Sequence, residues 1–228
     1  MFRVKICGIT TVEGALSVAR ADADAIGLNF FAKSPRYVSE DRARAIAEAI
    51  PAGVIKVGLF VNAPATDVCR TFDRLRLDLV QLHGDEPPEY LLDLGPHPVI
   101  RAFRLAGDGL GPVLEYLDEC RRLGASPRYV LIDSFRKGQY GGTGEKADWT
   151  TAARYCEASG FPPLVLAGGL TSKNVAEAIR AVCPMAVDTA SGVESSPGRK
   201  DTHLVAQFVQ AARRAFQAIS AAASEPPG

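Results

Sequence analysis

The 228-residue sequence has no excess of charge of either sign, because 26 lysines and arginines balance 26 aspartates and glutamates. This balance excludes the basic surface typical of nucleic-acid-binding proteins and the polybasic segment that anionic membranes attract. No apolar run approaches the roughly 20 residues that a membrane-spanning helix needs. The N-terminus leads almost directly into Val4-Lys5-Ile6-Cys7, without the charged and apolar regions of a signal peptide. We therefore expect a cytoplasmic protein whose partners include neither a membrane nor a nucleic acid.

Cysteine and histidine are scarce and scattered. The five cysteines contain no CxxC pair and are Cys7, Cys69, Cys120, Cys156 and Cys183. An odd number without close spacing favours reduced thiols over a disulfide framework or a zinc site. The three histidines form neither an HxH nor an HExxH motif, so we expect no bound metal.

Short apolar runs alternate with amphipathic segments along the chain. The predicted strands are Arg3–Cys7, Ala25–Phe30, Val54–Val61, Leu77–Leu82, Val99–Phe103, Tyr129–Asp133, Leu164–Ala167 and Ala186–Thr189. The predicted helices are Thr11–Arg20, Glu40–Ile50, Ala65–Leu75, Pro88–Leu94, Val113–Leu123, Trp149–Glu157, Lys173–Val182 and Thr202–Ala222. This pattern favours α/β architecture, a single (β/α)8 TIM barrel over residues 1–222 with a disordered tail at 223–228. The alternative, an open doubly wound sheet, usually has fewer strands and a dinucleotide turn, and no GxGxxG follows the first predicted strand.

Alternation within the strands predicts which side chains enter the barrel. Val4 and Ile6 share the face that should meet the helices. The side chains expected at the top of the lumen are those of Cys7, Asn29, Asp133 and Asp188. The same alternation places Gln81, His83, Arg101 and Phe103 inside. It leaves open whether Lys5, Lys56 and Arg101 form ion pairs inside the barrel or help to set the pKa of the Cys7 thiol.

Turns after the seventh and eighth predicted strands indicate a binding site for an anion. These turns contain Gly168-Gly169 and Ala190-Ser191-Gly192. In (β/α)8 enzymes these two loops frequently direct backbone N–H groups at a phosphate, and glycine allows close approach. Arg36, in the second loop beside Tyr37, carries a guanidinium that can hold a carboxylate through two parallel hydrogen bonds. We therefore expect a small phosphorylated molecule as the ligand.

Cys7 and Asp133 are the candidate catalytic residues. Each ends a predicted strand, and Asp133 precedes a loop rich in glycine, with Gly138, Gly141, Gly142 and Gly144. A thiol and a carboxyl that face one pocket are suited to proton transfer as base and acid. A Cys–His nucleophile with His83 is the alternative that these residues leave open.

Motifs along the whole chain resemble a known family. They are Lys5–Thr10 (KICGIT), Ser34–Ser39 (SPRYVS), Val80–Glu86 (VQLHGDE), Leu131–Asp133 (LID), Gly141–Gly144 (GGTG) with Asp148-Trp149, Leu166–Leu170 (LAGGL), and Val187-Asp188 through Ser191–Glu194 (SGVE). Any one motif is a weak signal, but their order and compatible spacing, from about residue 3 to the final helix, make the set highly specific. It resembles the phosphoribosylanthranilate isomerases of tryptophan biosynthesis, which are (β/α)8 barrels.

The resemblance implies an Amadori rearrangement of N-(5-phosphoribosyl)anthranilate to 1-(2-carboxyphenylamino)-1-deoxyribulose 5-phosphate, without a cofactor. It implies that Asp133 is the general acid for the furanose ring oxygen, and that the Cys7 thiolate is the base that removes the C2′ proton. Arg36 would hold the anthranilate carboxylate, and Asp188 would orient the substrate. The phosphate would be held by backbone N–H groups of Gly142, Gly168, Gly169, Ala190, Ser191 and Gly192.

Two other functions remain open at this point. One is a different sugar-phosphate isomerase or epimerase, such as the related aldose–ketose enzyme of histidine biosynthesis, which is expected to have an aspartate where this chain has Cys7. The other is a catalytically silent protein that binds a phosphorylated metabolite, which would need neither Cys7 nor Asp133. The sequence does not distinguish a monomer from a homodimer.

Overall fold

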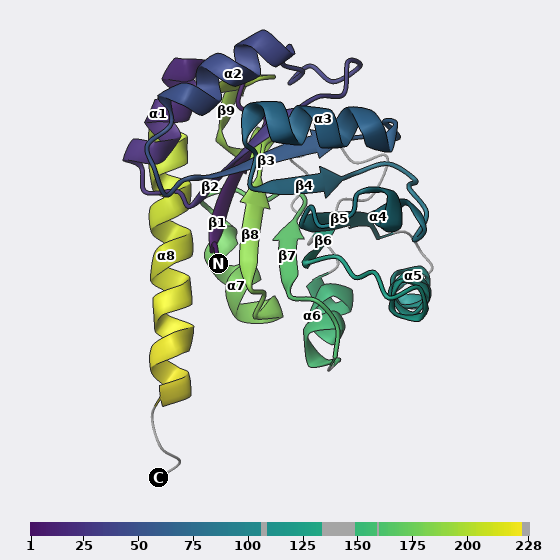
Figure 1. Ribbon diagram of the computed structural model, residues 1–228. Helices are drawn as coiled ribbons and strands as arrows, with labels where there is room; N and C mark the ends of the chain where they lie inside the picture. The colour runs from purple at the N-terminus through teal and green to yellow at the C-terminus, as the bar shows by residue number, and fades with distance from the viewer. Residues whose placement is uncertain (106–108, 134–148, 159, 225–228) are drawn as a thin grey trace.

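The structure is a computed structural model that describes residues 1–105, 109–133, 149–158 and 160–224. Eight parallel strands close into a barrel in chain order, and β1 is hydrogen-bonded to both β2 and β8. The strands are β1 Val4–Cys7, β2 Ala25–Asn29, β3 Ile55–Phe60, β4 Leu79–Leu82, β5 Val99–Arg104, β6 Tyr129–Asp133, β7 Leu164–Ala167 and β8 Ala186–Thr189. The predicted (β/α)8 TIM barrel is confirmed, and the open doubly wound sheet is excluded (Figure 1).

Helices alternate with these strands and surround the barrel (Figure 1). They are α1 Val12–Arg20, α2 Glu40–Ala49, α3 Ala65–Leu75, α4 Tyr90–Asp93, α5 Gly111–Arg122, α6 Trp149–Glu157, α7 Val175–Val182 and α8 Thr202–Ser224. Ser39 caps the N-terminus of α2, because its Oγ accepts a hydrogen bond from the Arg42 N–H at 3.4 Å. α4 is shorter than the predicted Pro88–Leu94 at both ends, and Gly95, with φ +60°, reverses the chain after its C-cap residue Leu94.

The C-terminal helix continues beyond its predicted end. α8 reaches Ser224, two residues past the expected end at residue 222, and residues 225–228 lie outside the described part of the chain. None of the described helices is long and apolar enough to cross a membrane.

Strand alternation produces two apolar layers. Val4, Ile6 and Val130 pack in the layer between the strands and the helices. Leu131 belongs to the second layer, inside the barrel. At the N-terminal end of the barrel the Phe2 ring packs edge-on against Tyr129, with ring centroids 5.4 Å apart. Because aliphatic side chains fill the lower lumen, the polar strand ends are left to line its C-terminal mouth.

The predicted orientation of Arg101 and Phe103 is wrong. The β5 residues inside the barrel are Ile100 and Ala102, so Arg101 lies on the outer side. There its guanidinium donates to the carbonyl oxygens of Leu82 and Gly84 at 3.2 and 3.1 Å, and it lies 5.0 Å from the centroid of the Phe103 ring. A buried guanidinium needs such partners, and the outer layer supplies them.

Lys56 is also outside the lumen. Its ammonium lies 3.7 Å from the Asp78 carboxylate, with 22% of the lysine side chain exposed. An ion pair of Lys56 inside the barrel is therefore excluded.

A short hairpin follows the barrel and was not predicted. After β8, a 3₁₀ turn η1 (Ser191–Val193) leads into β9 (Glu194–Ser196), which pairs with β10 (Arg199–Lys200). Gly198 permits the reversal, because its φ of +81° lies in the left-handed region. A hydrogen bond from Thr10 Oγ1 to the Gly198 carbonyl oxygen, at 2.6 Å, anchors the hairpin to the loop after β1.

Candidate active site

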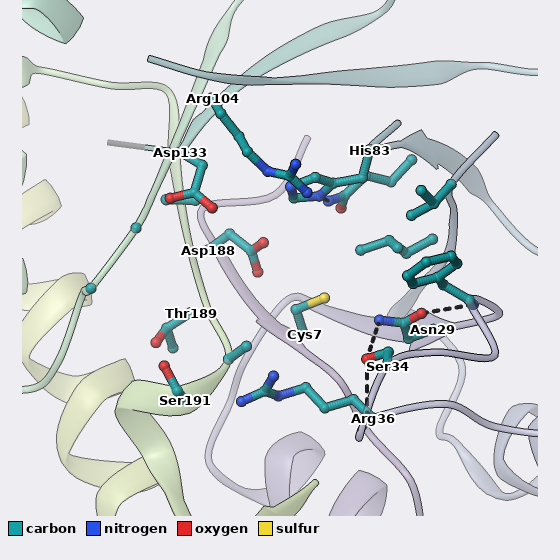
Figure 2. A pocket seen from close by; sticks show the side chains of 18 residues that line it. Cys7, Asn29, Ser34, Arg36, His83, Arg104, Asp133, Asp188, Thr189 and Ser191 are labelled. Carbon is teal, nitrogen blue, oxygen red and sulfur yellow. Dashed lines mark hydrogen bonds between the residues drawn. The ribbon is translucent and has the colours of Figure 1, made fainter. Parts of the chain in front are cut away.

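A cavity of about 540 Å³ opens at the C-terminal ends of the barrel strands. Eight of the ten predicted site residues line it, namely Cys7, Arg36, Asp133, Gly168, Gly169, Asp188, Ala190 and Ser191. Figure 2 shows Cys7, Asp133 and Asp188 around the same space, although they come from three different strands. The predicted convergence of these side chains at one end of the barrel is thus observed.

Cys7 projects from the end of β1 into this cavity and is only 6% exposed (Figure 2). Gly27, its neighbour on β2, makes room for it, because a Cβ at Gly27 would lie 2.7 Å from the Cys7 sulfur. Burial raises the pKa of the Cys7 thiol, and the nearby Lys5 ammonium opposes this rise. The thiolate therefore depends on a neighbouring positive charge.

Lys5 and Asp188 form a buried ion pair beneath the cavity. Lys5 Nζ lies 3.0 Å from Asp188 Oδ2, and the two side chains are 0% and 8% exposed. Burial disfavours the ammonium, but Asp188 and Cys7 outweigh this effect and raise the pKa of Lys5. Among the described residues, nothing donates a hydrogen bond to Asp188 Oδ1, which is also buried. Lys5 is therefore a charged residue of the barrel interior, close to the thiol.

Arg36 meets a carboxylate of the protein itself. Its Nε donates to Glu194 Oε1 at 2.8 Å and its Nη2 donates to Glu194 Oε2 at 2.6 Å. Gly8 permits this position, since a Cβ there would lie 2.4 Å from Arg36 Cδ. The hydrogen bonds that Arg36 donates to Glu194 raise the pKa of Arg36, so the guanidinium stays charged.

The loop that carries Arg36 is held by a chain of polar contacts. Asn29 Nδ2 donates to Ser34 Oγ at 3.1 Å, and the same oxygen accepts from the Arg36 N–H at 3.1 Å (Figure 2). Asn29 was expected at the top of the lumen and lines the cavity there. It therefore connects the barrel wall to the Arg36 loop.

The turns after β7 and β8 have the conformation expected for glycine. Gly168 and Gly169 adopt φ values of +94° and +63°, which only glycine adopts without strain. Gly192 does not line the cavity; it packs so closely on the neighbouring turn that a Cβ would lie 1.9 Å from the Leu170 carbonyl oxygen. Thr189 Oγ1 donates to that same oxygen at 2.7 Å and joins the two turns. Gly142, the tenth predicted residue, lies outside the described part of the chain.

His83 lines the cavity from the end of β4 (Figure 2). Its Nδ1 lies 3.1 Å from Gln81 Nε2. Burial and the charges of Arg104, Lys5 and Arg101 lower the pKa of His83 to about 4. The imidazole is therefore neutral near pH 7 and is a weak base. No group of three or more potential metal ligands occurs in the part of the chain that the structure describes.

Comparison with known proteins identifies the family. The sequence profile described as "N-(5'phosphoribosyl)anthranilate (PRA) isomerase" matches residues 4–211. This chain belongs to the phosphoribosylanthranilate isomerase family. The N-(5'-phosphoribosyl)anthranilate isomerase of Geobacter sulfurreducens is 47% identical over 214 residues, which cover 93% of this chain and 99% of that protein. That of Rubrobacter xylanophilus is 44% identical over 215 residues, or 93% of this chain and 100% of that protein.

Solved structures of the family have the same fold. The phosphoribosyl anthranilate isomerase of Thermotoga maritima is 37% identical, with a TM-score of 0.81 over 94% of this chain and 100% of that one. Another, solved in complex with reduced 1-(o-carboxyphenylamino)-1-deoxyribulose 5-phosphate, is 36% identical, with a TM-score of 0.79 over 94% and 100% of the two chains. A third solved structure contains monomers generated from the dimeric phosphoribosylanthranilate isomerase of Thermotoga maritima.

Three charged residues of this phosphoribosylanthranilate isomerase site were missed from the sequence. Arg104, the last residue of β5, lines the cavity. Glu194 was recognised only as part of a motif, and Lys200 was not recognised at all. Lys200 Nζ lies 2.8 Å from Glu194 Oε1, with 1% of the lysine side chain exposed. The sequence feature that could have predicted the contact between Glu194 and Lys200 is the Pro197-Gly198 pair. A turn at that point brings together the two strands that carry these residues.

Proposed function

We propose that this cavity isomerises N-(5-phosphoribosyl)anthranilate to 1-(2-carboxyphenylamino)-1-deoxyribulose 5-phosphate with Cys7 as general base and Asp133 as general acid. The isomerase activity and its place in tryptophan biosynthesis follow from membership of the family. The assignment of the acid and the base is supported by one observation above all. Cys7, at the end of β1, and Asp133, at the end of β6, line the same cavity (Figure 2).

The first proton moves from Asp133 to the furanose ring oxygen. The C1′–O bond then breaks, the nitrogen lone pair forms an iminium ion, and Asp133 is left as a carboxylate. This step requires a carboxyl that is still protonated near neutral pH, so the pKa of Asp133 must be higher than usual in the complex. Closing the cavity over the substrate would exclude water and favour the neutral carboxyl.

The second proton leaves C2′ and is taken by the Cys7 thiolate. The iminium ion makes this proton acidic, so a base of modest strength suffices. The resulting enolamine tautomerises to the ketone. Lys5 favours the thiolate, because its buried ammonium opposes the rise that burial causes in the pKa of Cys7.

The remaining predicted residues bind the substrate in this scheme. Arg36 holds the anthranilate carboxylate, and Asp188 orients the sugar from the floor of the cavity. Backbone N–H groups of Gly168, Gly169, Ala190 and Ser191, which all line the cavity, hold the phosphate, and the chemistry needs no cofactor. The rival Cys–His nucleophile is disfavoured, since a histidine with a pKa of about 4 gives little general-base assistance to a thiol.

The test is a steady-state fluorescence assay with freshly made phosphoribosylanthranilate. We expect Cys7→Ser and Asp133→Asn each to lower kcat by at least ~10²-fold, with little change in KM. Cys156→Ser and Asp118→Asn are matched controls, because both residues lie on outer helices away from the cavity, and they should retain wild-type kcat. Near-wild-type turnover in either active-site variant would remove the assignment. Faster turnover of the aldose substrate of histidine biosynthesis would favour the alternative isomerase.

A further inference from the structure

The guanidinium of Arg36 is occupied on one edge only. Five N–H donors are available to an arginine side chain, and two of them are bound to Glu194. Within the described part of the chain, no acceptor is found for the other three. Arg36 also lines the cavity (Figure 2), so the donors that Glu194 leaves free are available to a ligand.

Glu194 is fixed in turn by Lys200 from the same hairpin. Glu194 and Lys200 are register partners of β9 and β10, and Lys200 Nζ donates to Glu194 Oε1 at 2.8 Å. The same ammonium donates to the Ala190 carbonyl at 2.9 Å, in the turn that follows β8. With the side chains of Glu194 and Lys200 only 4% and 1% exposed, these contacts are formed in a nearly dry environment. Their geometry is therefore well defined.

The hairpin also contacts the loop after β1 and the loop that carries Arg36. Its Gly198 packs against the Pro35 backbone, since a Cβ at Gly198 would lie 3.0 Å from the Pro35 carbonyl oxygen. Thr10, just before α1, donates to the Gly198 carbonyl at 2.6 Å. Movement of the hairpin would therefore displace the loop that carries Arg36.

The charges of the three side chains give the cluster its binding property. Arg36 and Glu194 alone would be neutral and would attract a carboxylate weakly. Lys200 restores a net charge of +1 while it keeps Glu194 in place. Burial alone would raise the pKa of Glu194, but hydrogen bonds from Arg36 and Lys200 outweigh it and lower that pKa, so the carboxylate stays ionised.

We propose that Glu194 and Lys200 are positioning residues that hold the free edge of Arg36 towards the cavity, so that it binds the aryl carboxylate of the substrate. This inference rests on the proposed function, because it assigns the carboxylate of the substrate to Arg36. Neither residue touches the reacting atoms. Their proposed role is to set the affinity for one group of the ligand, and the Lys200 ammonium in addition lowers the pKa of the Cys7 thiol.

Positioning and simple electrostatics predict opposite effects of Glu194→Gln. Removing the negative charge makes the cluster more positive, so electrostatics alone would tighten the binding of a carboxylate. In glutamine an NH₂ group replaces one of the two carboxylate oxygens that accept from Arg36, so the guanidinium is free to rotate, and positioning predicts weaker binding. Lys200→Met should also weaken binding, because it leaves the neutral Arg36–Glu194 pair.

The experiment compares two ligands by calorimetry. One is reduced 1-(o-carboxyphenylamino)-1-deoxyribulose 5-phosphate, and the other is the same molecule with a plain phenyl ring. We expect Glu194→Gln to raise the Kd of the carboxylated ligand at least ~10-fold and to leave that of the other ligand unchanged. Arg36→Met should have a similar effect, and adding Glu194→Gln to it should change the Kd no further. Arg199→Gln, an exposed charge on the same hairpin, is the control and should bind both ligands as the wild type does.

Equal weakening of both ligands would indicate a general structural role and would overturn the proposal. Tighter binding of the carboxylated ligand by Glu194→Gln than by the wild type would also overturn the proposal. Failure of the proposed function has a different signature, namely a wild-type protein that does not isomerise phosphoribosylanthranilate in the fluorescence assay.

Discussion

The ion pair between Lys5 and Asp188 gives a stability prediction whose size follows from burial. Both side chains lie inside the barrel, their charged atoms are 3.0 Å apart, and Lys5 is completely buried. In the Asp188→Asn variant the Lys5 ammonium would remain in the lumen without its counter-charge. Breaking a buried pair in this way typically costs about 3–5 kcal/mol.

Release of the Lys5 proton limits this cost. A lysine with an ordinary pKa of about 10.4 can be neutralised at pH 7 for about 3.4 × 1.36, or roughly 4.6 kcal/mol. The folded variant would then hold a neutral Lys5, while the unfolded chain holds a protonated one. Since the unfolded state binds more protons, the stability of Asp188→Asn should rise with pH, by up to about 1.4 kcal/mol per pH unit between pH 7 and 10.

Urea unfolding followed by circular dichroism at pH 7 and pH 9 measures both effects. Lys5→Met/Asp188→Leu is the matched control, because it replaces both charges with apolar groups and should be less destabilised than Asp188→Asn. A loss below about 1 kcal/mol in Asp188→Asn would refute the reasoning. So would a loss in Lys5→Met/Asp188→Leu that equals the sum of the losses in Lys5→Met and in Asp188→Leu.

Two further predictions concern His83 and Gly192. The folded pKa of His83 is about 4 and its unfolded value about 6.5, so protonation favours the unfolded state. Between pH 6.5 and 4 the free energy of unfolding of the wild type should therefore fall by up to about 3 kcal/mol more than that of His83→Gln. Solvent screening at this partly exposed ring reduces that difference. Parallel plots of unfolding free energy against pH for the two proteins would contradict the prediction. Gly192→Ala should lower the free energy of unfolding by about 1–3 kcal/mol, because its Cβ would overlap the Leu170 carbonyl oxygen, whereas Gly111→Ala has open space and should be neutral in the same urea titration.

The barrel and most of the site were predictable because each strand ends at a recognisable point. Tyr129–Asp133 and Leu164–Ala167 are bounded by an acidic residue and by glycine, and both agree with the observed strands. The closing of the barrel follows from the number of strand–helix units. Residues at the ends of parallel strands then meet at one mouth, which brings Cys7 and Asp133 to the same cavity.

Predictions from the sequence failed where the alternation of side chains along a strand was ambiguous. They also failed where two residues in contact are distant in sequence. In Val99–Arg104, either set of alternate residues contains one arginine and two apolar side chains, so the pattern did not show which set faces inwards. The small Ala102 fits the lumen, while Arg101 finds carbonyl oxygens and aromatic rings outside. The contact between Arg36 and Glu194 spans 158 residues, and only the tertiary structure brings the two together.

The most direct test of the account is a single-turnover experiment with phosphoribosylanthranilate that carries hydrogen or deuterium at C2′. Single turnover removes product release from the measured rate, so it reports the chemical steps alone. With Cys7→Ser we expect a rate at least ~10²-fold below that of the wild type, and a further decrease with deuterium, because removal of the C2′ proton then limits the reaction. A rate within about two-fold of the wild type, or a slow rate that deuterium leaves unchanged, would contradict the role of Cys7 as the base.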